Sequence, residues 1–394
     1  MKIILFALCL LSLLVCFADA PAGSSPAVPR ETAVRQNPRL FLPEVIYATP
    51  GVEMNVYFDN IVLLINCDNY VFDVNCPKGR NDQKRWRFTP TESDLGTYDW
   101  SVRIIDDHGV LAEGTCKLQV SPLNAQENRP LSIMVVGDSL TAATVYPTRI
   151  FSQCQELGKI NLKMLGTRGP GPERSAVPGG VGHEGYGGWT WRAFAQHKDS
   201  KFLVFPNDDR TQKGTLDVQA FFKQQNDGQP PEVITVMLGI NDVFGANDEN
   251  LEERIVDICN NMDVLLAEFR RCAPQAIIGV SLVTPGAATQ DAFGANYKCG
   301  QTRWQYKKNQ HRLNEVMKER FAASNPYGVI LIPTYCNLDC ENNFPQASEE
   351  VNLGNNKKIS RLSNGVHPAS SGYNQIGDTF FSWLMAVLPS LPAK

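Results

Sequence analysis

The fold is decided by the stretch LSIMVVGDSL at residues 131–140. Apart from Ser132, its first six residues are apolar and half of them are β-branched, and the run stops at a Gly-Asp-Ser turn. Runs of the same form recur at residues 232–242, 276–285 and 328–335. Continuous apolar runs of this kind are typical of strands buried on both faces of a parallel sheet.

Amphipathic stretches lie between these runs. In residues 250–272 and 302–324 apolar side chains recur at intervals of three and four, which predicts helices. Strands that alternate with helices predict a three-layer α/β/α sandwich with a parallel sheet over residues 131–394. The functional side chains of such a fold lie beyond the carboxyl ends of the strands.

Residues 40–122 follow another pattern, with short alternating segments separated by turns, which predicts a small all-β sandwich. The predicted strands are residues 52–58, 62–68, 84–90, 98–106 and 115–121. The segment Asp94-Leu-Gly-Thr-Tyr98 resembles the tyrosine corner of immunoglobulin-like domains, in which the Tyr hydroxyl bonds a nearby backbone group. Trp100 stands where such domains usually have Cys. Trp86 and Trp100 are candidates for sugar binding, although such aromatic residues more often belong to a core.

The chain begins with an expected signal peptide at residues 1–20: Lys2, then an apolar run, then Ala18 and Ala20 as alternative cleavage positions. A lipoprotein anchor at Cys16 is disfavoured because bulky residues precede it. Residues 21–39 and 123–130 are polar or rich in Pro and Ser, which is typical of linkers. We therefore expect a secreted or periplasmic protein that is soluble after processing.

Length and charge narrow the function classes. A chain of 394 residues exceeds what one core usually serves, which favours two domains. The net charge is −4, with 37 basic and 41 acidic residues and no long charged run, so nucleic acid is excluded as an expected partner. No stretch after the signal approaches the roughly 20 apolar residues of a transmembrane helix.

Nine cysteines remain after the signal, which is an odd number. In an oxidising compartment we expect some of them to pair, with Cys67 to Cys76 or Cys116, and Cys299 to Cys336 or Cys340, as candidate bonds. No Cys-x-x-Cys pair with zinc spacing occurs, so no structural metal is expected.

Four short motifs occur in order: Gly137-Asp-Ser-Leu140, Gly185-Tyr-Gly-Gly-Trp-Thr190, Gly239-Ile-Asn-Asp242 and Gly365-Val-His-Pro368. A Gly-Asp-Ser turn alone is common as a helix N-cap. Together the four motifs resemble the SGNH or GDSL serine hydrolases, a family of esterases and lipases, over residues 131–394. The resemblance implies a flavodoxin-like α/β/α fold, ester hydrolysis through an acyl-enzyme, and no cofactor.

The resemblance also assigns roles to residues. Ser139 matches the nucleophile and His367 the general base. The oxyanion donors match the N–H of Ser139, the N–H of Gly188 and the side chain of Asn241, with Gly187 as the alternative to Gly188. His183 lies near the second motif, and two roles are expected for it: lining the pocket, or capping or holding a loop.

The chain departs from the family at one position. Asn364 stands where the family usually has Asp, three residues before the His. Asn can accept a hydrogen bond from the imidazole but carries no charge. We favour a Ser139–His367 dyad with Asn364 as orienter. The alternatives are another carboxylate, such as Asp339, or a slowed or inactive enzyme.

The expected substrate is an acylated carbohydrate, from which acetyl groups are removed. Tyr186, Trp189 and Trp191 beside the second motif are candidates to stack on sugar rings or to fill the core. The alternatives are an esterase for lipids or other carboxylic esters, acyl transfer to a sugar, and a non-catalytic carbohydrate-binding protein on a retired hydrolase fold.

Overall fold

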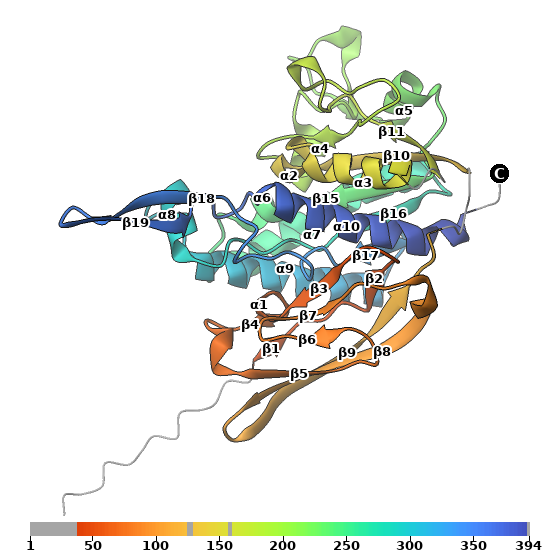
Figure 1. The fold of residues 1–394 in the computed structure, drawn as a ribbon. Coiled ribbons are helices and arrows are strands. Elements are labelled where there is room, and N and C mark those ends of the chain that lie inside the picture. The colour runs from red at the N-terminus through yellow and green to blue at the C-terminus, as the bar shows by residue number, and fades with distance from the viewer. Residues whose placement is uncertain (1–37, 124–128, 157–159, 392–394) are drawn as a thin grey trace, which may run out of the picture. The chain divides into compact units, whose positions relative to one another are not determined.

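A parallel sheet organises the C-terminal part of the chain (Figure 1). The computed structural model describes residues 38–123, 129–156 and 160–391. The sheet has the strand order β11-β10-β15-β16-β17, and short β12 pairs with β10 off this path. The strands are β10 (Arg129–Gly137), β11 (Ile160–Leu165), β12 (Glu184–Gly185), β15 (Val233–Met237), β16 (Ile277–Ser281) and β17 (Val329–Ile332). All four apolar runs are strands of this sheet, which confirms that prediction.

Helices cover both faces of the sheet (Figure 1). On one face α3 (Val145–Glu156) packs against α10 (Ser370–Val387). The other layer contains α4 (Trp191–Gln196), α5 (Val218–Asn226), α7 (Leu251–Cys272) and α9 (Arg303–Ala323). Gly279 of β16 lets α10 approach closely, since a Cβ there would lie 2.5 Å from the Trp383 ring. The predicted three-layer α/β/α sandwich and both long helices are confirmed.

Smaller elements complete this part. They are α2 (Ser139–Ala142), α6 (Ile240–Val243), α8 (Gln290–Tyr297), β13 (Leu203–Val204), β14 (Thr215–Leu216), and a hairpin of β18 (Gln346–Asn352) and β19 (Asn355–Leu362). The sequence analysis missed the hairpin because its strands are charged and mostly exposed rather than alternating. Cross-strand ion pairs join Lys358 to Glu350 (3.2 Å) and Arg361 to Glu349 (2.6 Å).

The β-rich region consists of small sheets. One has the order β2-β9-β8-β5, a second β3-β7-β6, and β1 pairs with β4. Only β2 and β9 run parallel; the other pairs are antiparallel. The bounds are β1 (Arg39–Leu40), β2 (Val45–Ala48), β3 (Met54–Tyr57), β4 (Val62–Leu63), β5 (Val71–Asn75), β6 (Arg80–Asn81), β7 (Arg85–Phe88), β8 (Gly96–Asp106) and β9 (Gly109–Val120), with the one-turn helix α1 (Phe58–Ile61) after β3.

Two local predictions for this region are confirmed and one is wrong. The Tyr98 hydroxyl donates to the Asp94 carbonyl at 3.0 Å, as in a tyrosine corner. Trp86 and Trp100 are 1% and 0% exposed, so both are core residues and not sugar-binding surfaces. The strand expected over residues 62–68 ends at Leu63, because the Asn66 side chain accepts the N–H of Asp68 at 2.9 Å and starts a 3-10 turn.

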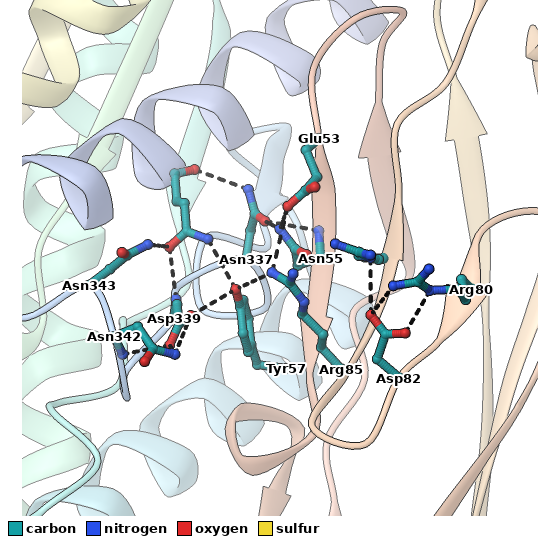
Figure 2. Close-up of polar contacts among 12 residues, drawn as sticks. Glu53, Asn55, Tyr57, Arg80, Asp82, Arg85, Asn337, Asp339, Asn342 and Asn343 are labelled. Atoms are coloured by element: carbon teal, nitrogen blue, oxygen red, sulfur yellow. Dashed lines mark hydrogen bonds and ion pairs between the residues drawn. The ribbon is translucent and has the colours of Figure 1, made fainter.

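Buried asparagines join the β-rich region to the segment after β17. Asn337 accepts from the backbone N–H and the side-chain amide of Asn55, both at 2.9 Å (Figure 2), and donates to Thr379 of α10 at 3.2 Å. Asn60 donates to the carbonyls of Tyr335 and Leu338, both at 2.8 Å. Apolar side chains from both regions form one continuous core. The two sequence regions therefore share an interior.

All nine cysteines after the expected signal are free, so the candidate disulfides are wrong for this structure. The Cys67 thiol lies 3.3 Å from Asp59 Oδ1 and the Cys340 thiol 3.5 Å from Asn60 Oδ1. Cys299 is exposed whereas Cys336 and Cys340 are buried, which disagrees with a bond from Cys299 to either of them. The signal peptide and most of both linkers fall outside the described residues. Within the described residues no helix is long and apolar enough to cross a membrane.

Candidate active site

Ser139 lies at the carboxyl edge of the sheet, two residues after the end of strand β10. Gly137 ends the strand, and a Cβ there would lie 2.0 Å from Thr141 Oγ1 and 2.8 Å from the Met237 carbonyl. Asp138 caps α2 by accepting the N–H of Leu140 at 2.9 Å. Ser139 is thus the first helical residue, where backbone N–H groups have no partner inside the helix. Its side chain is only partly buried.

Asn241 follows the neighbouring strand β15 and lies at the same edge of the sheet. Met237 lies opposite Gly137 in the parallel pair, so both chains leave the sheet side by side. Gly239 makes the turn at φ +123°, a backbone conformation that favours glycine. Asn241 then lies in α6, and its side-chain amide donates to the Trp189 carbonyl at 3.0 Å. The third motif is therefore bonded to the loop of the second.

The second motif follows β12, which pairs with the end of β10. The N–H of Tyr186 donates to the Gly137 carbonyl at 3.1 Å, and this holds the loop beside the Ser139 turn. Gly188 is exposed and has φ +78°, whereas Gly187 is not among the glycines with positive φ. Within the described part of the chain, the Gly188 N–H has no backbone acceptor. It is therefore available to a ligand.

His367 reaches the serine from the loop between β19 and α10. Its Nε2 lies 2.9 Å from Ser139 Oγ. Burial lowers the pKa of His367 below its ordinary value, which favours the neutral ring at pH 7. A neutral imidazole with its proton on Nδ1 can accept the Ser139 proton at Nε2. The pair has the geometry of a nucleophile and its base.

Asn364 holds the backbone of the His367 loop. Its Oδ1 accepts the N–H of Val366 at 3.1 Å and of His367 at 2.9 Å. Among the described residues, the expected bond from the imidazole to Asn364 is not formed. Asn364 therefore shapes the loop that carries His367 instead of orienting the ring directly.

In the sequence analysis, Asp339 was the alternative carboxylate that would complete a catalytic triad with Ser139 and His367. Its carboxylate accepts from the Tyr57 hydroxyl at 3.3 Å (Figure 2). It also accepts from the N–H groups of Glu341 and Asn342 at 3.0 and 2.9 Å. Within the described ranges no carboxylate forms a hydrogen bond or ion pair with the His367 ring. Among the described residues, the side-chain partner of the His367 ring is therefore Ser139 and not a carboxylate.

Two carboxyl groups that the sequence analysis passed over lie behind the site. Asp138 and Asp242 are buried, and the Oδ2 atom of each has no hydrogen-bond partner in the described residues. Burial raises the pKa of both to about 7, and the charge of Asp242 contributes to the rise at Asp138. The sequence signal was their position, directly before Ser139 and directly after Asn241. A protonated Asp138 avoids placing negative charge beside the serine turn.

His183 has a loop role. It is buried, its Nδ1 accepts the N–H of Gly185 at 3.1 Å, and its Nε2 lies 3.0 Å from Thr144 Oγ1. Burial lowers the pKa of His183 to about 4, so the ring is neutral at pH 7. Because Thr144 has φ +68°, this contact also ties down a strained residue beyond α2.

The aromatic residues of the second motif are mostly core. Trp191 is 0% exposed and Trp189 9%, so neither ring is free to stack on a sugar. Tyr186 is partly exposed, and its ring stacks on Trp189 with centroids 4.0 Å apart. Arg168 lies over the Tyr186 ring at 5.3 Å. Of the three, only Tyr186 is partly exposed.

A serine and a histidine in contact at the carboxyl edge of a parallel sheet agree with a family match. The model of the GDSL-like lipase/acylhydrolase family matches residues 135–375. This chain belongs to that family. It is therefore a hydrolase of carboxylic esters. No curated protein matches the chain.

The solved structures that match the chain include a family 3 carbohydrate esterase from Talaromyces cellulolyticus. The identity is 16% and the TM-score 0.41, and the match covers 66% of this chain and 100% of that one. A family 3 carbohydrate esterase of Clostridium thermocellum has 16% identity and a TM-score of 0.40, with 66% and 98% covered. A carbohydrate acetylesterase from Sinorhizobium meliloti has 13% identity and a TM-score of 0.37, with 66% and 100% covered.

The buried carboxyl groups predict a pH-dependent stability. An Asp with a folded pKa of about 7 against 3.8 when exposed keeps its proton in the folded state while the unfolded chain loses it. Stability from this source therefore falls as the pH rises from about 4 to about 7. Asp138→Asn removes the effect and still offers an acceptor to Leu140.

Urea unfolding at pH 5 and pH 8 tests this. The unmodified protein should lose stability from pH 5 to pH 8 through Asp138, by at most about 3 kcal/mol, and Asp138→Asn should not show this loss. The exposed Asp257→Asn variant is the control and should lose stability as the unmodified protein does. A difference for Asp138→Asn that stays constant with pH would contradict the assignment.

Proposed function

We propose that this protein is a secreted serine esterase that removes acyl groups, in particular acetyl groups, from carbohydrate. Ser139 is the nucleophile and His367 the general base. The observation that carries the proposal is the 2.9 Å contact between Ser139 Oγ and His367 Nε2 at the carboxyl edge of the sheet. Family membership supports the ester bond as the target.

The reaction proceeds in two halves. Ser139 Oγ attacks the ester carbonyl as its proton passes to His367 Nε2, and a tetrahedral intermediate forms. The imidazolium returns the proton to the leaving sugar hydroxyl, which leaves Ser139 acylated. Water then attacks the acyl-enzyme, with His367 again as base, and the free acid is released. No cofactor or metal takes part in this scheme.

Three donors are proposed to stabilise the oxyanion: the N–H groups of Ser139 and Gly188 and the side-chain amide of Asn241. The N–H of Ser139 is at the start of α2 and that of Gly188 is in an exposed loop. One amide hydrogen of Asn241 is used by the Trp189 carbonyl, which leaves the second for the oxyanion. Such donors act without reorganisation during the reaction.

The carbohydrate substrate is supported by the exposure of the site. Gly187 and Gly188 are exposed, and Ser139 and Tyr186 are partly exposed, so an ester on a bulky polymer can approach. The same residues would also catalyse transfer of the acyl group to a sugar hydroxyl. That reaction differs from hydrolysis only in that the sugar hydroxyl, and not water, accepts the acyl group.

The location and the β-rich region belong to the same proposal. Secretion is supported by Lys2, the apolar run of residues 3–17 and the small residues Ala18 and Ala20. We regard residues 40–122 as an immunoglobulin-like accessory sandwich, supported by the bond from Tyr98 to the Asp94 carbonyl. The proposed catalytic domain spans residues 131–394.

The first prediction concerns the dyad. A fluorophosphonate probe should label the protein, and Ser139→Ala should abolish the labelling. Because the base has no task without the nucleophile, Ser139→Ala and His367→Ala should each remove most turnover of 4-nitrophenyl acetate, and the double variant should be no worse. Multiplicative losses would contradict the pairing, and labelling that does not depend on Ser139 would favour a non-catalytic carbohydrate-binding protein.

A second prediction concerns the oxyanion donors. Asn241→Ala should lower kcat by about 10² to 10³ with little change in KM, because the donor acts on charge that develops in the transition state. Steady-state kinetics on the same ester measure both constants. If only KM changes, Asn241 belongs to substrate binding.

The third prediction concerns the missing carboxylate. Asn364→Asp keeps an oxygen for the N–H groups of Val366 and His367 and adds a negative charge that stabilises the imidazolium. We expect kcat at neutral pH to rise and the requirement for Ser139 to persist. Asp339→Asn is the matched test of the alternative and should leave kcat nearly unchanged. A loss in both variants would reject the dyad.

A further inference from the structure

A cavity of about 490 Å³ lies where the β-rich region meets the segment after β17. The β-rich region supplies one wall, including Tyr57, Tyr70 and Lys84, and the α/β part supplies the other, including Thr289 and Asp339. Figure 2 shows part of this wall, where the Tyr57 hydroxyl lies between Arg85 and Asp339. The volume is within the range of about 300 to 1,000 Å³ typical of small-molecule sites.

The cations of the wall are already paired. Lys84 lies 2.6 Å from Asp68 and 3.9 Å from Glu341, and Arg303 pairs with Asp59. Arg85 lies 3.6 Å from Glu53 and donates to the Tyr57 hydroxyl at 2.8 Å. An anionic ligand would have to displace these carboxylates. A phosphate or an acidic group is therefore a poor fit.

The carboxylates of the wall are committed too. Asp59 holds Lys307 at 2.7 Å in addition to Arg303. Asp339 accepts from Tyr57 and from the N–H groups of Glu341 and Asn342. Within the described residues no cluster of His, Cys, Asp and Glu side chains could hold a metal ion. The site therefore suits a ligand without charge.

The neutral groups of the wall are the ones left available. The Tyr70 ring packs on the core at one side and is half-buried, and no ring or cation contact to it occurs in the described part of the chain. The side chain of Gln83 is exposed and makes no hydrogen bond to the described residues. An aromatic ring with a neighbouring amide group matches a sugar ring, which has an apolar face and a rim of hydroxyls.

The cavity wall is joined to the loop of the proposed base. The N–H of Ala288 donates to the Cys340 carbonyl at 2.9 Å, and both residues line the cavity. The N–H of the adjacent Ala287 donates to the Gly365 carbonyl at 3.0 Å, two residues before His367. One short stretch of backbone thus connects the cavity to the loop that contacts Ser139.

We infer that this cavity is a subsite for a neutral oligosaccharide chain, with Tyr70 as the stacking platform and Gln83 as a hydrogen-bonding group. The inference rests on the proposed function, because the chain held here is the polymer whose acyl group Ser139 removes. It assigns the β-rich region a direct part in recognising the substrate.

The test measures binding without turnover. In the Ser139→Ala background, isothermal titration with xylohexaose, cellohexaose and N-acetylchitohexaose identifies which neutral chain binds. Tyr70→Ala in the same background should weaken that binding by about tenfold or more, and Tyr70→Phe should retain it. Tyr327→Ala, at a half-buried tyrosine outside the cavity, is the matched control and should bind normally.

A second measurement separates this inference from the proposed function. Tyr70→Ala with Ser139 intact should hydrolyse 4-nitrophenyl acetate at the unmodified rate, which also shows that the variant is folded. Equal binding by Tyr70→Ala and its parent, or no binding of any of the three chains, overturns the subsite. Loss of Ser139-dependent hydrolysis in the unmodified protein would overturn the proposed function and leave the binding result to be judged separately.

Discussion

The close approach of the chain at Gly137 is the constraint on which the site depends. Thr141 of α2 and the carbonyl of Met237 both occupy the space that a Cβ would need. Because β10 and β15 are adjacent and parallel, this contact lets α2 and α6 begin beside each other. The loop after β12 joins them through the bond from Tyr186 to the Gly137 carbonyl. The close packing at the end of β10 therefore fixes the positions of the first three sequence motifs.

Much of the α/β architecture followed from periodicity, because its strands are buried on both faces and read as continuous apolar runs. The long helices α7 and α9 likewise began and ended within a residue of the predicted bounds. The charged hairpin of β18 and β19 was missed because exposed strands held by ion pairs carry no apolar signal. The strand predicted through Asn66 failed because a local side-chain bond to Asp68 competes with the ladder.

For the site, the resemblance of the four motifs to the family identified Ser139 and His367, and the structure brings the two side chains into contact. The role of Asn364 could not be predicted from the sequence. Whether its side-chain carbonyl accepts from the His367 ring or from the backbone depends on the path of the loop that carries both residues. The buried state of Asp138 and Asp242 was also hidden, since it arises from tertiary packing around both turns. Cysteine pairing failed for the same reason, because spacing along the chain says nothing of which thiols meet.

The asparagine contacts between the β-rich region and the segment after β17 bear on how the protein can be divided. The family match begins at residue 135, yet Asn337 inside it takes two of its hydrogen bonds from Asn55, far outside it. A fragment cut at the linker would lose these hydrogen bonds, together with those from Asn60 to the carbonyls of Tyr335 and Leu338, and would uncover one side of a continuous core. The part of the chain that carries the catalytic motifs therefore shares its interior with the β-rich region, and we expect a fragment of residues 131–394 to be less stable than the whole chain.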